Sequence, residues 1–405
     1  MKYIKDFKFN IFDLNFILSF CGFALMTSLP ITINSVVYRA FALGVGLLCI
    51  AKGDLKILRK NRMLKTLVIM LVLLSLQTTV HMLFGVYSDS PYTNTKNMVL
   101  LFSYGVVLIP ILGSIAGFGK MHWASTPTIL LICLLYIGVK GAMSPMDIDN
   151  TGRMSLNARQ SVLALGDNGS FLLFLSACFL RFAKFSKSED RFMLLLSIIG
   201  VVAGTACVVL AGSRGPFVSG LFCLIFIFST LSVKKGLIIG MVTAITISSI
   251  GLSSKMVQDI APVLFSRMTN TVEDGDMSGR DVLFEEAINT MMDNFLIGTC
   301  PFEVNKDSFS SSHNGFLDVG VGLGVIGFFV YILITLNILL TLFKNRRLLK
   351  TTPLLFIASF FYWNFARAMS GAGLLDNANY TLSVAAACYL VYYLRNDRKY
   401  IKSIE

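Results

Sequence analysis

Residues 311–343 read SSHNGFLDVGVGLGVIGFFVYILITLNILLTLF and place a short polar sequence directly before a long apolar run. The run predicts a helix over about 316–343, which is long enough to cross a bilayer, because about 20 apolar residues span the hydrocarbon core. His313 and Asn314 therefore precede a membrane helix, where a polar substrate would meet a lipid. We expect the chemistry of this protein at this junction.

The composition indicates an all-α polytopic membrane protein. Hydrophobic residues make up 55% of the 405 residues, charged residues make up 14%, and the mean hydropathy is +0.71. These values do not describe a soluble domain. We therefore interpret residues 1–405 as one integral membrane domain. Apolar runs predict about twelve transmembrane helices, at 12–28, 35–51, 66–85, 98–118, 127–143, 161–181, 192–211, 216–232, 236–253, 316–343, 352–369 and 380–394.

The distribution of charge predicts the orientation of these helices. Most of the 35 lysines and arginines fall in alternate connecting segments, which is typical of cytoplasmic loops. With these segments inside, both termini are cytoplasmic and the segment over about 254–312, between the ninth and tenth helices, is a long outer loop. The net charge of +12 then lies largely beside anionic lipid headgroups, and it is poor evidence for nucleic acid as a partner.

Three arginines oppose this bias on the outer side. Arg214 lies in a turn between two predicted helices, Arg280 lies in the outer loop, and Arg159 precedes the sixth helix. Guanidinium groups are permanently charged and match phosphate oxygens, so several of them together would suit a lipid pyrophosphate. The alternative is that they reach toward lipid headgroups or form salt bridges with neighbouring acids.

The order of these motifs resembles a known family. Ser213-Arg214-Gly215 in a short turn, Gly279-Arg280-Asp281 and an amphipathic stretch over 284–298 in the outer loop, and then His313-Asn314 before a glycine-rich helix resemble the O-antigen ligase and O-antigen polymerase superfamily. These are bacterial membrane glycosyltransferases of the metal-independent GT-C type. The resemblance covers about residues 157–343. Members often carry a glutamate near the last glycines of the His-Asn motif, whereas this chain has Gly322 at about that position.

The resemblance implies an undecaprenyl-pyrophosphate-linked oligosaccharide as donor, bound by Arg214 and Arg280. His313 is implied as the catalytic or acceptor-orienting residue. The active site would lie on the periplasmic side of the inner membrane, with part of it in the 254–312 loop. No cofactor is implied, and the expected partners are the lipid-linked donor, membrane lipid and other polysaccharide-assembly proteins.

The chemistry of these residue types agrees with that assignment. A fixed guanidinium can stabilise the negative charge of a leaving pyrophosphate without a metal ion. Histidine side chains titrate near neutral pH, so His313 can take the proton of an acceptor hydroxyl. Asn314 would hold a sugar hydroxyl or cap the following helix, and Asp318 would orient His313 from one turn later. We group Arg159, Asn314 and Asp318 as substrate-binding candidates.

Four alternatives remain open at this stage. The string from Asp274 to Glu285 has part of the spacing of a calcium-binding loop, and Asp147 with Asp149 resembles the acidic pairs of metal-dependent glycosyltransferases. A twelve-helix transporter or flippase of lipid-linked oligosaccharides belongs to another class, but the two halves of the chain show no convincing repeat. Within the superfamily, the turn reads Ser-Arg-Gly-Pro, which favours a polymerase over a ligase.

Overall fold

The computed structural model describes seven stretches of the chain, together with isolated residues between 44 and 51, 131 and 139, 147 and 155, 266 and 269, and at 304. The seven stretches are residues 56–84, 162–182, 188–230, 279–300, 312–349, 354–370 and 378–396. The described part is helical apart from one short antiparallel pair, β1 (Asp147–Ile148) with β2 (Met154–Ser155). The prediction of an all-helical membrane protein is confirmed for these residues.

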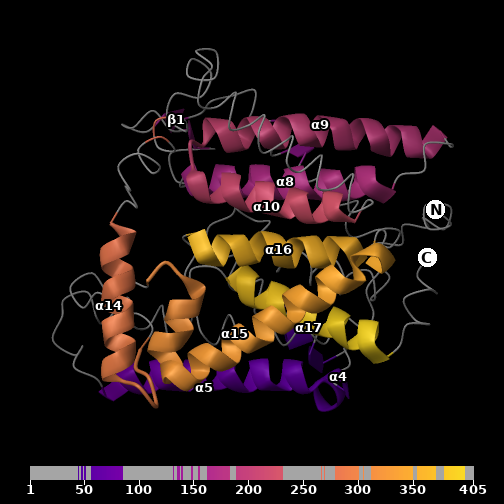
Figure 1. The fold of residues 1–405 in the computed structure, drawn as a ribbon. Coiled ribbons are helices and arrows are strands. Elements are labelled where there is room, and N and C mark those ends of the chain that lie inside the picture. Colours follow the sequence, from indigo (N-terminus) through magenta and orange to yellow (C-terminus); the bar gives the residue numbers. More distant parts are fainter. Residues whose placement is uncertain are drawn as a thin grey trace.

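Three helices lie together at the top of the bundle in Figure 1. They are α8 (Val162–Phe182), α9 (Ser188–Leu210) and α10 (Arg214–Ser229), with α9 above α8 and α10. Helices α8 and α9 approach closely because glycines face each other: a Cβ on Gly204 would lie 2.6 Å from the carbonyl oxygen of Gly169. Small residues commonly permit this close packing between membrane helices.

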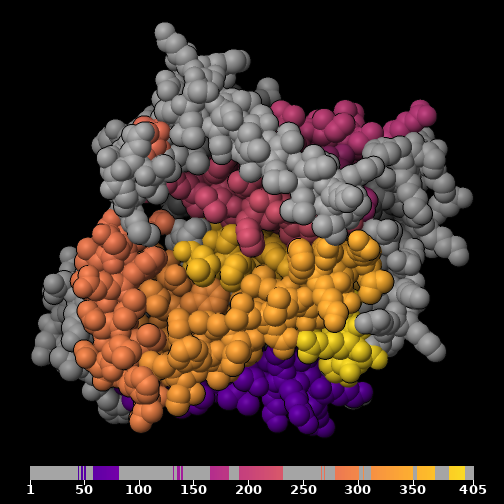
Figure 2. Space-filling model, viewed as in Figure 1, coloured from indigo at the N-terminus to yellow at the C-terminus, as the bar shows by residue number. Residues whose placement is uncertain are grey.

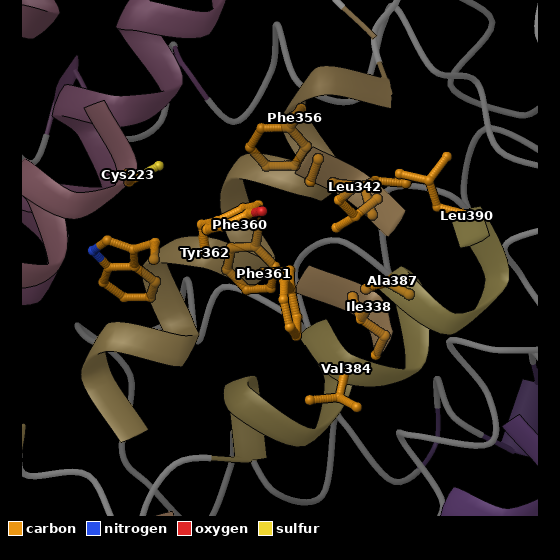
Figure 3. Close-up of a cluster of buried hydrophobic side chains, with 14 of the residues drawn as sticks. Cys223, Ile338, Leu342, Phe356, Phe360, Phe361, Tyr362, Val384, Ala387 and Leu390 are labelled. Carbon is orange, nitrogen blue, oxygen red and sulfur yellow. The ribbon is translucent and has the colours of Figure 1, made fainter. Parts of the chain in front are cut away.

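Helix α16 (Leu354–Ser370) lies between these three helices and a second group of helices. Residues 354–364 of α16 are all buried, and Phe356, Phe360 and Phe361 reach zero or near-zero exposure. Figure 3 shows these rings packed with side chains of α10, α15 (Gly315–Leu349) and α17 (Ala378–Asn396). A helix that is apolar on all sides is expected at the centre of a bundle.

The second group contains α15 and α17 together with α5 (Arg62–Phe84), which follows the short α4 (Lys56–Lys60). Helix α5 begins four residues before the predicted boundary of its helix at 66. Its start is fixed by Asn61, because Asn61 Oδ1 accepts a hydrogen bond from Leu64 N at 3.2 Å and Asn61 Nδ2 donates to Cys388 O at 2.9 Å.

Helix α15 differs from the single helix predicted over 316–343, because it is broken at Gly324. The backbone there has φ 68° and ψ −175°, which no helical residue adopts. The break separates a first half, residues 315–323, from a second half, residues 325–349. Helix α14 (Arg280–Asp293) packs against the first half and crosses the ends of the other helices in Figure 1.

Three described helices are long and apolar enough to cross a membrane, at Arg62–His81, Arg191–Leu210 and within Gly315–Leu349, and two shorter apolar helices run over Arg214–Ser229 and Leu354–Met369. The chain is therefore a membrane protein. The predicted helices at 12–28, 98–118 and 236–253 lie outside the described residues, and those at 35–51 and 127–143 are described only at isolated positions. The total of twelve stays a prediction.

Side-chain contacts show which helix ends lie together. Phe222 of α10 contacts Phe365, and Phe226 stacks on Tyr362, so α10 and α16 are antiparallel. Phe316 of α15 also contacts the Phe365 ring. The first residues of α10 and α15 therefore lie at one end of the bundle with the last turn of α16. We call this end the His313 end.

Candidate active site

Arg214 is the first residue of α10 and follows a tight turn, as the sequence predicts. Helix α9 ends at Leu210, and Gly212 takes the left-handed conformation at φ 57°. The turn closes with hydrogen bonds from Ala211 N to Cys207 O and from Gly212 N to Val209 O, both 3.0 Å. Arg214 is partly exposed at the start of a helix, where backbone N–H groups also favour an anion.

The Pro216 side chain fixes this turn against α8. A Cβ on Gly166 would meet Pro216 Cγ at 2.9 Å and Ala211 Cβ at 3.3 Å, so only glycine at 166 lets the turn pack this closely. Proline is tolerated in the first turn of a helix, where no intrahelical N–H bond is lost. The turn that presents Arg214 is therefore held by a specific contact with α8.

The residues on either side of His313 in the sequence belong to a buried network of hydrogen bonds. Ser312 donates to Asp318 Oδ1 through its backbone N at 3.0 Å and its Oγ at 2.6 Å. Asn314 N in turn donates to Ser312 Oγ at 3.1 Å. Ser312 and Asp318 are fully buried and Asn314 is 8% exposed. The carboxylate of Asp318 therefore binds the residue that precedes His313.

Asn314 caps α15. Its Oδ1 accepts hydrogen bonds from Phe316 N at 3.0 Å and Leu317 N at 3.3 Å, and its backbone oxygen accepts from Asp318 N at 2.9 Å. Asparagine is a favoured N-cap residue because it satisfies N–H groups that have no intrahelical partner. Of the two roles considered from the sequence, the structure shows the cap, which uses only the Oδ1 atom of the side chain.

His313 has an unusual backbone conformation, with φ 54°. In the described part of the chain it is the one non-glycine residue with positive φ. This conformation costs about 1–2 kcal/mol for an ordinary L-residue. Such strain persists where the surroundings enforce it, and it is concentrated at functional sites. Here the hydrogen bonds of Ser312 and Asn314 fix the backbone on both sides of a partly exposed imidazole.

The first half of α15 is held in place through backbone contacts with the turn after α14. Thr299 N donates to Val321 O at 2.6 Å, and Val325 N donates to Phe295 O at 2.9 Å. A Cβ on Gly298 would lie 2.5 Å from the backbone of residues 322–324, and a Cβ on Gly324 would lie 2.5 Å from Phe295 O. Two glycines 26 positions apart thus allow the two backbones to touch.

Helix α5 supports the same turn from the other side. Gln77 Nε2 donates to Gly298 O at 3.1 Å and lies 3.4 Å from His81 Nε2, and His81 Nδ1 lies 3.4 Å from Thr299 Oγ1. These contacts place His81 as a support of the α14–α15 connection.

A buried ion pair lies at the same end, between α8 and α16. Arg367 Nε is 2.8 Å from Asp167 Oδ1, and Arg367 Nη2 donates to Asp167 Oδ2 at 3.0 Å. The Arg367 side chain is 4% exposed and the Asp167 side chain 28%. Asp167 follows Gly166, on which the Arg214 turn packs. Two-point pairing of this kind fixes orientation as well as charge.

The other predicted residues fall as follows. Arg280 is the first helical residue of α14, is partly exposed, and follows Gly279, whose φ is 74°. Arg159, the Asp274 and Asp276 part of the calcium-like string, and Asp149 lie outside the described residues. Among the residues that the structure describes, no three His, Cys, Asp or Glu side chains form a group that could hold a metal ion.

Several supporting residues were not predicted. Ser312 lies inside the quoted motif, yet the sequence assigned it no role. Asp167 interrupts an apolar helix, and a charge in a membrane helix normally has a partner, so this signal was present. Its partner Arg367 is 200 positions away, which sequence spacing cannot reveal.

Comparison with known proteins adds the family. A family model described as O-antigen ligase matches residues 199–332. This range begins in α9, contains Arg214, Arg280 and His313, and ends just after the break at Gly324. Among curated proteins, none matches the chain. The match supports the resemblance found in the sequence: the part of the chain that carries the candidate site is similar to the O-antigen ligase family.

Proposed function

We propose that this protein is an O-antigen polymerase that joins undecaprenyl-pyrophosphate-linked oligosaccharide repeats on the periplasmic side of the bacterial inner membrane. The observation that carries the proposal is the left-handed backbone conformation of His313, which is held in place just before α15. It lies within the matched family range and at the same end of the bundle as Arg214. Residues 254–312 contribute to this site as the periplasmic loop.

The proposed reaction is a glycosyl transfer. An acceptor hydroxyl attacks the anomeric carbon of the donor sugar, a new C–O bond forms, and the bond to the pyrophosphate oxygen breaks with its electron pair. His313 takes the proton of the acceptor hydroxyl, a contribution of roughly 10²–10⁴ in rate. Arg214 and Arg280 bind the pyrophosphate and stabilise the charge that it gains as it leaves.

The remaining candidates have smaller roles in this proposal. Asn314 uses Oδ1 as a helix cap, so its amide N–H₂ is the part assigned to a sugar hydroxyl. Asp318 acts as a positioning residue, because it binds Ser312 next to His313. Arg159 is assigned to donor binding from the sequence alone.

Metal independence follows from assigning the leaving-group charge to guanidinium groups. Activity of the purified protein should then survive excess EDTA, and substitution of Asp274 and Asp276 by alanine should be tolerated. Loss of activity on chelation, with recovery on addition of calcium or magnesium, would instead support the calcium-like string in the outer loop.

A ligase, which transfers the glycan to the lipid A core, is the second candidate, and the similarity to an O-antigen ligase family favours it. The polymerase assignment depends on the Ser-Arg-Gly-Pro turn, whose proline packs on Gly166. Lipopolysaccharide from a deletion strain distinguishes the two on a gel. Core carrying a single repeat indicates a polymerase, and bare core indicates a ligase. Complementation with the intact gene should restore the full ladder. The transporter alternative gains no support from the family match.

A further inference from the structure

The turn that follows α14 exposes three consecutive large apolar side chains. Phe295 is 47% exposed, Leu296 is 65% and Ile297 is 73%. Polar residues of α14 that are also exposed lie together on one face of the helix, at Glu285, Asn289 and Asp293. Helix α14 also exposes Val282 (54%), Ile288 (45%) and Met292 (54%), so the turn continues an exposed apolar strip of the helix, and exposure of this strip to water would be costly.

Two helices indicate the depth of this turn in the membrane. Phe295 O accepts a hydrogen bond from Val325 N. About 19 residues separate Val325 from the basic group that begins at Lys344, which is roughly 28 Å at 1.5 Å per residue. That length equals the hydrocarbon thickness of a bilayer, about 30 Å. On α5, Gln77 contacts Gly298 and lies about 15 residues, or roughly 22 Å, from Arg62. Both counts place the turn within the hydrocarbon, near its boundary.

The backbone of the turn is suited to that depth. Gly298 N donates to Asn294 O at 2.9 Å, Gly298 O accepts from Gln77, Phe295 O accepts from Val325 N, and Thr299 N donates to Val321 O. Polar backbone groups in hydrocarbon must be satisfied within the protein, because lipid offers no hydrogen bonds. Backbone groups of Phe295, Gly298 and Thr299 thus have protein partners, while the side chains of residues 295–297 are exposed.

The exposed side chains continue onto α15. Beyond Gly324, Ile326 is 59% exposed and Phe329 is 57% exposed, and both lie on the exposed stripe of the second half of that helix. Figure 2 shows α14 and α15 forming one uninterrupted surface. The turn therefore extends the surface that a membrane-crossing helix presents to lipid.

We propose that residues 295–297, together with Ile326 and Phe329, contact the acyl chains of the leaflet at the His313 end and anchor α14 to the membrane. Helix α14 then lies at the bilayer surface, its C-terminal turn is fixed in the hydrocarbon, and Arg280 at its first position is held at headgroup level. This inference goes beyond the proposed activity and does not depend on it.

Fluorescence quenching by lipid tests the proposal. Ile297→Trp is made in the full-length protein, and Asn289→Trp on the polar face of α14 serves as the matched control. Each variant is reconstituted into phosphatidylcholine vesicles with and without bromine atoms on the acyl chains. The emission of the two native tryptophans is subtracted by means of wild-type protein. Leu296→Trp repeats the measurement in case the first variant folds poorly.

We expect brominated chains to quench most of the added emission of Ile297→Trp and little of that of Asn289→Trp. Acrylamide in the aqueous phase should give the reverse order. Quenching of Ile297→Trp by acrylamide and not by brominated lipid would overturn the proposal, because the turn would then face water. Protection of Ile297→Trp from both quenchers would also overturn it, since a protein surface such as a second copy of the chain would then cover the turn.

Discussion

The two halves of α15 are built on different principles. In residues 315–323 nearly every side chain is buried, the fixed points are hydrogen bonds of Asn314 and Asp318, and the backbone touches another segment directly. Residues 325–349 instead expose apolar side chains along one stripe, at Ile326, Phe329, Leu333, Leu336, Leu340 and Phe343. The exposed stripe of the second half is apolar, as expected for a surface that contacts lipid. The first half is held in place by specific contacts with other protein segments, and such contacts can position catalytic groups.

The ends of the two halves differ as well. The first half follows the strained His313, whereas near the end of the second half Arg346 donates hydrogen bonds to two backbone carbonyls. Arg346 Nε donates to Ser229 O at 3.2 Å, and its Nη1 donates to Phe343 O at 2.7 Å. Cations are stabilised at such positions by the helix dipole. We therefore assign Arg346 a structural role at this end.

The largest effect is expected where the first half is joined to α14. Gly298→Ala should reduce stability by about 3 kcal/mol or more, because its Cβ would collide with backbone atoms that cannot move independently. Gly279→Ala is the matched control: its φ is also 74°, but no atom lies within 4 Å of the added Cβ, so it should cost only about 1 kcal/mol. Thermal unfolding in detergent measures both. Equal losses would show that the close backbone contact is unimportant.

Arginines at the two ends should differ in activity. Arg280→Ala should lower turnover by roughly 10²-fold or more, the usual cost of removing a group that stabilises transition-state charge. Arg280→Lys should keep part of the activity, since the charge survives but the two-point geometry is lost. Arg346→Ala should retain nearly wild-type turnover in the same proteoliposome assay. A larger loss of turnover in Arg346→Ala than in Arg280→Ala would contradict our placement of the active site at the His313 end.

Asp318→Ala should weaken the network next to His313. It leaves the backbone N–H of buried Ser312 without its acceptor, which costs about 1–3 kcal/mol, whereas Ser312 Oγ can still donate to Asn314 O. Turnover should fall by roughly 10-fold or more, because His313 loses the neighbour that fixes its backbone. Asp318→Asn keeps one oxygen acceptor and should recover part of the activity. Parallel measurement of melting temperature and turnover shows whether Asn restores both.

The smallest effect is expected in the second half. Leu333 is 64% exposed on the stripe that we assign to lipid, so Leu333→Ala creates no internal cavity. Stability should change by less than about 0.5 kcal/mol and turnover should be unchanged. A loss of several kcal/mol on unfolding would show that the stripe packs against protein.

The sequence predicted the long apolar helices better than the broken first half of α15. Hydropathy located α8, α9, α10, α16 and α17 within a few residues, because apolar length is a local property. The break at Gly324 was missed, since a run of glycines among valines and leucines reads as a continuing apolar helix. At the break the backbone of residues 322–324 lies against Gly298, and only the folded chain brings these residues together.

In the candidate site, too, local features could be predicted from the sequence and long-range contacts could not. Local motifs identified His313, Asn314 and the Arg214 turn, since each depends on neighbouring residues. The Asp167–Arg367 pair and the support of Gly298 by Gln77 join positions that are 200 and 221 residues apart. One sequence contains no signal for such pairings, although a buried charge in an apolar helix indicates that some partner exists.

In our proposal, His313 takes the proton of the acceptor hydroxyl at the start of α15. His313→Asn tests it most directly, because asparagine tolerates the left-handed conformation but cannot act as the base. Wild-type and variant protein should be compared in proteoliposomes that contain the lipid-linked oligosaccharide donor. We predict an unchanged melting temperature, a fall in turnover of roughly 10²-fold or more, and accumulation of unused donor. Wild-type turnover in a folded His313→Asn protein would show that His313 is not the base.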